Sequence, residues 1–155
     1  MSGTELTQPN ALALKLGYGG LLPFVLGAAL IWIVRADAHA YVTASLSAYA
    51  AVILSFLGGI HWGLGMRSLG MQLQAQKQPA PTSMFVWGVL PSLVAWVAVI
   101  MPAYAGLVIQ GVALMICYLV DRKVYPRCGA SAWLTLRFRL TAVASLSCFI
   151  GAAGS

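Results

Sequence analysis

Few side chains of this sequence could do chemistry, and most of them lie inside or beside long apolar stretches. His61 lies in the segment LGGIHWGLGM, Asp121 ends one apolar stretch, and Arg137 and Arg139 begin another. An ionisable side chain in a membrane span is by default a candidate for a functional site. His61 could act as an acid or base with arginine polarising a head-group substrate, or it could be a neutral core residue bonded to a carbonyl or hydroxyl group.

Two glycines flank His61 on one helix face. Gly58 comes three residues before the histidine and Gly65 four residues after it, which places all three on the same side of a helix. The missing side chains leave space beside the imidazole. That space could accept a flat ligand ring or another helix.

A second face of the same helix carries small residues every four positions. Ser55, Gly59 and Gly63 belong to this series, and the last two form a G-x-x-x-G step. Such a stripe lets two helix backbones approach closely in lipid. We therefore expect these three residues to serve helix packing, either within the chain or between protomers.

Polar residues also recur at helical spacing in the last two apolar stretches, and we expect both sets to face the bundle interior. An ion pair between Asp121 and Arg137 or Arg139 would lock the two helix ends together, whereas a spare arginine could hold an anionic or quinone-like head group. The first set is Gly106, Gln110, Cys117 and Asp121, and the second is Arg137, Thr141, Ser145 and Cys148.

Aromatic residues at similar depth could supply ring contacts to a ligand or act as interfacial anchors. The resulting candidate ligand-binding residues are Gly58, His61, Trp62, Gly65, Arg67, Tyr118, Asp121, Arg137 and Arg139. We expect no catalytic residue, because the sequence has no hydrolase, zinc-protease, P-loop or dinucleotide motif.

Metal and cofactor sites are not expected either, although a bound quinone or lipid remains an option. The acids Glu5, Asp37 and Asp121 are far apart, and the three cysteines form no C-x-x-C motif. Haem held by two histidines is disfavoured because His39 is predicted to lie across the membrane from His61.

Composition identifies the environment in which these residues act. Apolar residues make up 61% of the 155 residues and charged residues only 8%, against roughly 25% in a typical soluble domain. The net charge of +6 comes from nine Lys and Arg residues in short breaks between apolar stretches, so we expect no nucleic-acid partner.

Five apolar stretches, each near the roughly 20 residues that cross a bilayer, predict an all-α, polytopic bundle of five transmembrane helices. We expect one membrane domain over residues 1–155 with polar cytoplasmic loops at 67–83 and 121–133. Pro23 and Pro91 should either kink their helices or line a cavity. The expected helices are about 16–34, 43–66, 84–101, 103–120 and 134–154.

Loop charges predict the orientation. With five spans, eight of the nine Lys and Arg residues fall on the side of the N-terminus, and only Arg35 falls on the other. Basic residues in short loops are retained in the cytoplasm. We therefore expect the N-terminus inside and the C-terminus outside.

Several segments together resemble the transmembrane protein 69 family, whose bacterial members are described as a domain of unknown function. The resemblance spans nearly the whole chain, and it implies a membrane helical bundle found in bacteria and mitochondria without assigning a reaction or a catalytic residue. The segments are GYGGLLPFVLGA at 17–28, ILSFLGGIHWG at 53–63, LPSLVAW at 90–96, YLVDR at 118–122 and LRFRLT at 136–141.

The leading functional hypothesis is a non-enzymatic protein of the bacterial inner (cytoplasmic) membrane that binds a lipid or quinone, or that serves as an accessory or assembly component of a larger membrane complex. Expected partners are membrane lipids, including anionic ones, a second copy of the chain, or subunits of such a complex. The alternatives are a membrane enzyme that uses His61 with boundary arginines, and a small-solute transporter or channel.

Overall fold

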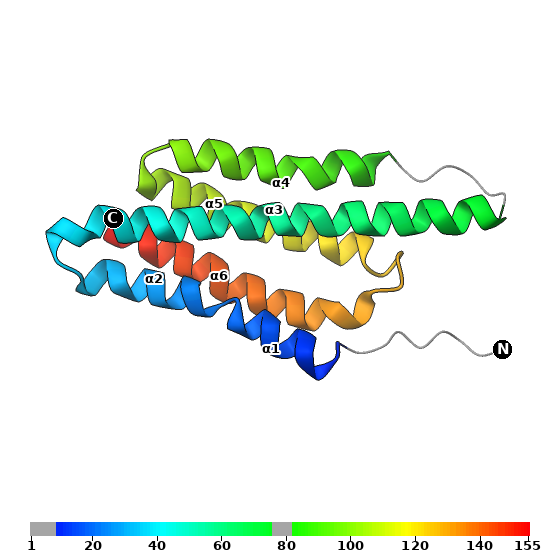
Figure 1. Cartoon of the computed structure of the whole chain (residues 1–155), viewed down its shortest axis with the longest axis horizontal. Helices are drawn as coiled ribbons and strands as arrows, with labels where there is room; N and C mark the ends of the chain where they lie inside the picture. The colour runs from blue at the N-terminus through cyan, green and yellow to red at the C-terminus, as the bar shows by residue number, and fades with distance from the viewer. Residues whose placement is uncertain (1–8, 76–81) are drawn as a thin grey trace.

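The computed structural model describes residues 9–75 and 82–155, with side chains described for all of these except 68–75. Every regular element in these ranges is a helix (Figure 1). Five helical segments are long and apolar enough to cross a membrane, which confirms the predicted all-α class and the number of spans. The elements are α1 (Ala11–Gly19), α2 (Leu22–Ile33), α3 (Ala36–Ala75), α4 (Ser83–Ile100), α5 (Ala103–Val124), the short 3-10 helix η1 (Ser131–Trp133) and α6 (Leu134–Gly154).

The helix α3 is longer than the sequence pattern indicates. It begins at Ala36 and continues to Ala75, so it includes the first part of the predicted 67–83 loop. No proline interrupts this extension, and its Met, Leu, Gln and Ala residues have good helix propensity. Residues 76–81 of the predicted loop lie outside the described residues. The helix α5 likewise continues to Val124, past the expected end at 120.

The first membrane segment is broken into two helices. The helix α1 ends at Gly19, and α2 begins at Leu22 with Pro23 in its first turn. Proline has no N–H to offer the carbonyl of Gly19, and its ring would clash with that group in a continuous helix. The Tyr49 hydroxyl of α3 donates a hydrogen bond of 2.9 Å to the Gly20 carbonyl, which satisfies one backbone group at the break.

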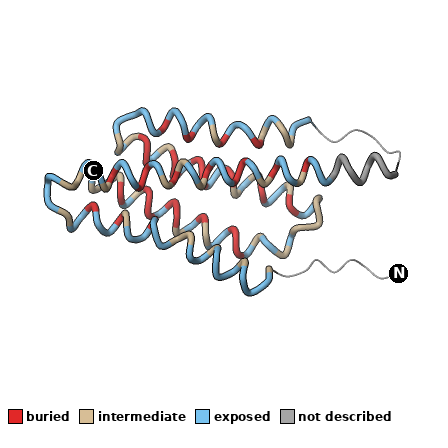
Figure 2. The backbone as a smooth tube through the Cα atoms, in the orientation of Figure 1, coloured by how far each residue is buried: buried red, intermediate tan, exposed pale blue. Residues whose placement is uncertain are grey.

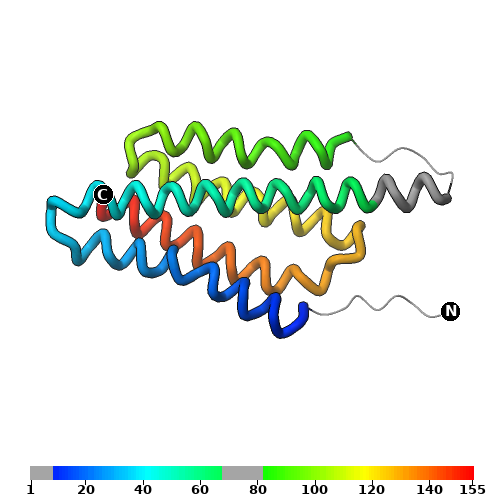
Figure 3. The backbone as a smooth tube through the Cα atoms, in the orientation of Figure 1, coloured from blue at the N-terminus to red at the C-terminus, as the bar shows by residue number. Residues whose placement is uncertain are grey.

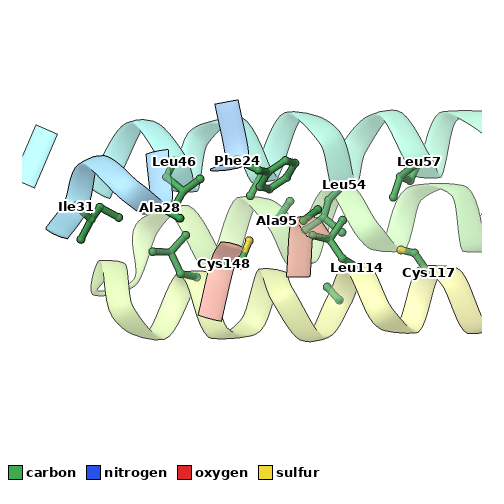
Figure 4. Close-up of a cluster of buried hydrophobic side chains, with 14 residues drawn as sticks. Phe24, Ala28, Ile31, Leu46, Leu54, Leu57, Ala95, Leu114, Cys117 and Cys148 are labelled. Carbon is green, nitrogen blue, oxygen red and sulfur yellow. The ribbon is translucent and has the colours of Figure 1, made fainter. Parts of the chain in front are cut away.

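The long helix α3 runs along the bundle, with α4 packed along it and α5 packed along α6 (Figure 1). The helix α2 packs against both α3 and α6, whereas α1 packs against α6. Buried residues follow the inward faces of these helices, and exposed residues face outward (Figure 2). Apolar side chains from α2, α3, α4, α5 and α6 meet in the interior, as Phe24, Leu54, Ala95, Leu114 and Cys148 show (Figure 4).

The two described ends of the chain lie at opposite ends of the bundle (Figure 3). At one end, a ring nitrogen of His39 lies 2.8 Å from the Gly154 carbonyl oxygen, which joins the start of α3 to the end of α6. At the other end, α1 begins, α5 ends and α6 begins (Figure 1). This second end carries Lys15, Arg67, Arg122 and Lys123, and we call it the basic end.

Candidate functional site

Three charged or ionisable side chains from three helices meet inside the bundle near the basic end. Asp121 of α5 is 1% exposed, His61 of α3 is 2% exposed, and Arg137 of α6 is 8% exposed. Arg137 donates two hydrogen bonds to Asp121 Oδ2, one of them from Nε at 2.8 Å. The predicted ion pair is therefore confirmed for Arg137. We call these three residues the buried charge cluster.

The stripes of polar and small residues explain how α5 and α6 bring these groups together. All the members that the sequence indicated on the two helices are buried, so the prediction that they face the bundle interior is confirmed. Further along the same stripe, several turns from Asp121, Gln110 of α5 donates a hydrogen bond of 3.0 Å to the Ser47 carbonyl of α3. Polar contacts of this kind fix the relative rotation of helices where apolar packing alone discriminates poorly.

His61 faces oxygen atoms on both sides of its ring. Its Nδ1 lies 3.3 Å from the Leu57 carbonyl oxygen, one turn earlier in α3, and its Nε2 lies 3.4 Å from Asp121 Oδ1. The second contact is at ion-pair distance but lacks hydrogen-bond geometry. A neutral imidazole has one N–H donor for these two acceptors. His61 thus approaches the carboxylate that Arg137 also contacts.

Helix α4 occupies the glycine-flanked face of His61. A Cβ atom on Gly58 would overlap the carbonyl oxygen of Gly88, and one on Gly65 would touch the ring of Phe85. Trp62 packs edge-on against the same Phe85 ring and donates a 3.0 Å hydrogen bond to its carbonyl. The space beside the imidazole could have accepted a flat ligand ring or another helix, and the structure shows that helix α4 fills it.

The stripe formed by Ser55, Gly59 and Gly63 lies on a different face, which meets no other helix within the described part of the chain. A Cβ on Gly59 or Gly63 would have no atom within 4 Å, and Ser55 is exposed. The Ser55 hydroxyl donates to the Ala51 carbonyl of its own helix. These residues therefore do not pack against another helix among residues 9–67 and 82–155, because α4 contacts α3 along the adjacent Gly58 face. Contact between protomers stays a prediction.

A cavity of about 590 Å³ lies between α1 and α3, with α5 and α6 as its floor. The volume is within the range of small-molecule sites, about 300 to 1,000 Å³. Two of its wall residues, Leu16 of α1 and Phe56 of α3, are 67% and 65% exposed, so the cavity opens sideways from the bundle between these helices. Gly20 and Leu21, at the break between α1 and α2, also line the cavity. The break that Pro23 causes therefore borders a cavity.

The cavity wall is apolar along most of its length and polar near the basic end. Its apolar part includes leucine, isoleucine, phenylalanine, glycine and alanine residues from the four helices and from α2. Arg67, Tyr125, Arg137 and Thr141 supply the polar groups, and Trp133 lies beside them in the wall. Arg137 is thus shared by the cavity and the buried charge cluster.

The remaining sequence candidates are distributed around this site. Arg67 lines the cavity, while His61 is not among the lining residues. Arg139 donates to the Tyr18 hydroxyl at 3.2 Å and so joins α6 to α1. Tyr118 packs against Phe138, with ring centroids 5.6 Å apart, which is an anchoring contact between α5 and α6.

Sequence reasoning missed the apolar wall of the cavity and three residues near the buried charge cluster. Tyr125 is buried, it lines the cavity together with Arg137, and its ring centroid lies 6.4 Å from that of His61. Trp87 packs edge-on against His61 from α4, also with centroids 6.4 Å apart. Thr141 was noted as an interior residue but not as part of a binding wall. The spacing of Tyr125, four residues after Asp121, was the available signal.

Metal-binding geometry is absent from the part of the chain that the structure describes. No three His, Cys, Asp or Glu side chains in residues 9–67 and 82–155 are grouped to hold an ion. The cysteines Cys117, Cys128 and Cys148 are free thiols.

A family model described as "Protein of unknown function (DUF3429)" matches residues 9–153, which includes every residue of the cavity and of the buried charge cluster. The chain belongs to the DUF3429 family. As a DUF3429 member it is also 36% identical over 142 residues to "Transmembrane protein 69" of Xenopus tropicalis, which confirms the resemblance seen in the sequence. The alignment covers 87% of this chain and 51% of the frog protein, so the chain spans about half the length of that relative.

No solved structure matches this DUF3429 chain. Its five apolar helices and its relative identify it as a multi-pass membrane protein. The description of the family assigns no function. Functional inference therefore depends on the cavity and on the side chains around it.

Proposed function

We propose that this protein binds a membrane amphiphile, a lipid or a quinone, in the cavity between α1 and α3. The observation that carries the proposal is the cavity itself, which is apolar along its length, polar at the basic end, and open sideways past Leu16 and Phe56. In a membrane, that opening faces acyl chains. An amphiphile could enter laterally with its chain along the apolar wall and its head beside Arg67 and Arg137.

In the proposed binding function, His61 has an indirect role. The histidine lies behind the cavity wall, where it contacts Asp121, and Asp121 in turn holds Arg137. His61 thereby helps to position the arginine that would meet the ligand. A partner subunit or a second copy of the chain would be an additional feature of the same protein, detectable in the experiment below.

Filling the cavity should displace the bound amphiphile. Ala13 of α1 lines the cavity, and Ala13→Phe would place a ring in the space that we assign to an apolar chain. We expect native mass spectrometry and lipid extraction after purification in mild detergent to show bound amphiphile on the wild-type protein and most of it lost from the variant. The same spectra report the oligomeric state and any copurifying subunit.

Ala11→Phe is the matched control, because Ala11 lies on the same helix, is exposed and does not line the cavity. It should retain the ligand. A wild-type protein without bound amphiphile, or equal retention in both variants, would contradict the proposal. Thermal unfolding of the variants in detergent checks that the bundle is intact.

The proposed orientation places the basic end in the cytoplasm. The basic end carries Lys15, Arg67, Arg122 and Lys123, whereas the other end has Arg35 beside Asp37. Retention of basic loops inside predicts an active periplasmic reporter, such as alkaline phosphatase, when it is fused after Ser155 in a bacterial inner membrane. Activity from a fusion after Tyr125 instead would reverse the orientation.

A further inference from the structure

The polar end of the cavity presents hydrogen-bond donors and no carboxylate. Among the lining residues, Arg67 and Arg137 carry guanidinium groups, and Tyr125 and Thr141 carry hydroxyl groups. No Asp or Glu is among them. A site of this composition suits a ligand group that accepts several hydrogen bonds.

The charges around this end do not cancel. Asp121 is the only acid near it within residues 9–67 and 82–155, because Asp37 lies at the opposite end of α3. Its carboxylate already receives two hydrogen bonds from Arg137 and the approach of His61 Nε2. Arg67 has no acidic partner in these ranges. One positive charge at the cavity therefore lacks a counterion from the described part of the chain.

A buried hydroxyl in the wall also lacks a partner. Thr141 is 5% exposed and lines the cavity one turn after Arg137, yet no hydrogen bond satisfies its Oγ1 within the described structure. Threonine in a helix commonly bonds to the carbonyl four residues earlier, as Thr43 does here with His39. A buried hydroxyl without a partner is costly, and a ligand oxygen would remove that cost.

We propose that the cavity selects an amphiphile with a phosphate-bearing, anionic head over one with a neutral head. This inference rests on the proposed function and specifies its ligand. The phosphate oxygens would lie between Arg67 and Arg137, at the end of the cavity that Thr141 and Tyr125 also line. A quinone could accept hydrogen bonds from the same donors, but it would leave the charge of Arg67 unbalanced. Basic pockets between transmembrane helices bind anionic lipid heads in this manner.

Competition between matched ligands tests the selection. The purified full-length protein is placed in nanodiscs that contain equal amounts of phosphatidylglycerol and phosphatidylcholine, and bound lipid is counted by native mass spectrometry. A second arm compares a polyprenyl phosphate with a long-chain quinone, which distinguishes a phospholipid source of phosphate from an isoprenoid one. We expect the anionic member to be preferred in at least one arm. Arg67→Gln should reduce that preference about fivefold.

Arg122→Gln is the matched control, since Arg122 is an exposed arginine at the same end that does not line the cavity. It should keep the preference, and Thr141→Val should weaken it while leaving the protein folded. Equal binding of charged and neutral heads by the wild-type protein would overturn the inference. So would an equal effect of both arginine substitutions, which would assign the preference to general surface charge.

These outcomes are distinct from failure of the proposed function. If the cavity binds an amphiphile without regard to head charge, Ala13→Phe still removes it, and only the phosphate inference is wrong. If Ala13→Phe has no effect on bound amphiphile, both proposals are wrong.

Discussion

Asp121→Asn is expected to destabilise the folded protein by about 3 to 5 kcal/mol, because it leaves Arg137 with a buried, unbalanced charge. The amide can still accept a hydrogen bond, so the effect isolates the loss of charge. Equilibrium unfolding in mixed detergent micelles would measure it. A second substitution, Arg137→Gln, should restore most of the loss by removing the cation that Asp121 neutralised.

The control for this prediction is Asp37→Asn. Asp37 is exposed in the first turn of α3, where the helix N-terminus stabilises a carboxylate weakly, so we expect a loss below about 1 kcal/mol. If the effects of Asp121→Asn and Arg137→Gln simply add, the two side chains are not energetically coupled. The buried charge cluster would then have no structural role as a unit.

Gly58→Ala and Gly106→Ala should each destabilise the bundle by roughly 1 to 3 kcal/mol or more, because there is no room for a methyl group. At Gly58 the added Cβ would overlap the Gly88 carbonyl of α4, and at Gly106 it would overlap the Ala98 carbonyl. Backbone atoms cannot rotate away as a side chain can. The helices α3 and α4, or α4 and α5, would have to separate. Unfolding free energies in micelles would report the loss.

Gly59→Ala and Gly63→Ala, on the same helix as Gly58, should not destabilise the bundle. Both glycines face open space, so alanine adds no clash and improves helix propensity by up to about 1 kcal/mol. We expect neutral or stabilising effects for the isolated protomer. Destabilisation by either variant, with loss of a dimer in native mass spectra, would instead show that the small-residue stripe packs between protomers.

The contrast between these glycines shows what sequence pattern can and cannot predict. The G-x-x-x-G step at Gly59 and Gly63 was the more conspicuous signal, but the close approach within the chain uses Gly58 and Gly88. Helical spacing identifies which residues share a face. It does not reveal which face a neighbouring helix will cover, since that depends on where α4 lies.

The sequence did predict the contact between Asp121 and Arg137 in the buried charge cluster. Asp121 and Arg137 each continue a stripe of small and polar residues on its own helix, and both stripes had to face the interior. Since one helix ends near where the next begins, the two charges were expected at the same depth. The approach of His61 to the same carboxylate was not predicted, because it depends on the rotation of α3 against α5.

The cavity could not be predicted, because it results from a divergence of helices. Pro23 indicated a break, and the sequence left open whether that break would kink the helix or line a cavity. The space forms because α2 packs against both α3 and α6, whereas α1 packs against α6 and diverges from α3. Only the direction that the chain takes at Gly20 and Leu21 determines this separation.

The same break lets α1 move separately from the rest of the bundle. The helix α1 buries none of its residues, whereas α5 and α6 bury many. An element with so little surface buried against its neighbours can undock from the bundle at a small fraction of the global unfolding free energy while it stays helical in the lipid. Undocking of the nine residues Ala11–Gly19 would widen the sideways opening of the cavity, and the rest of the bundle would stay folded as a bound molecule leaves.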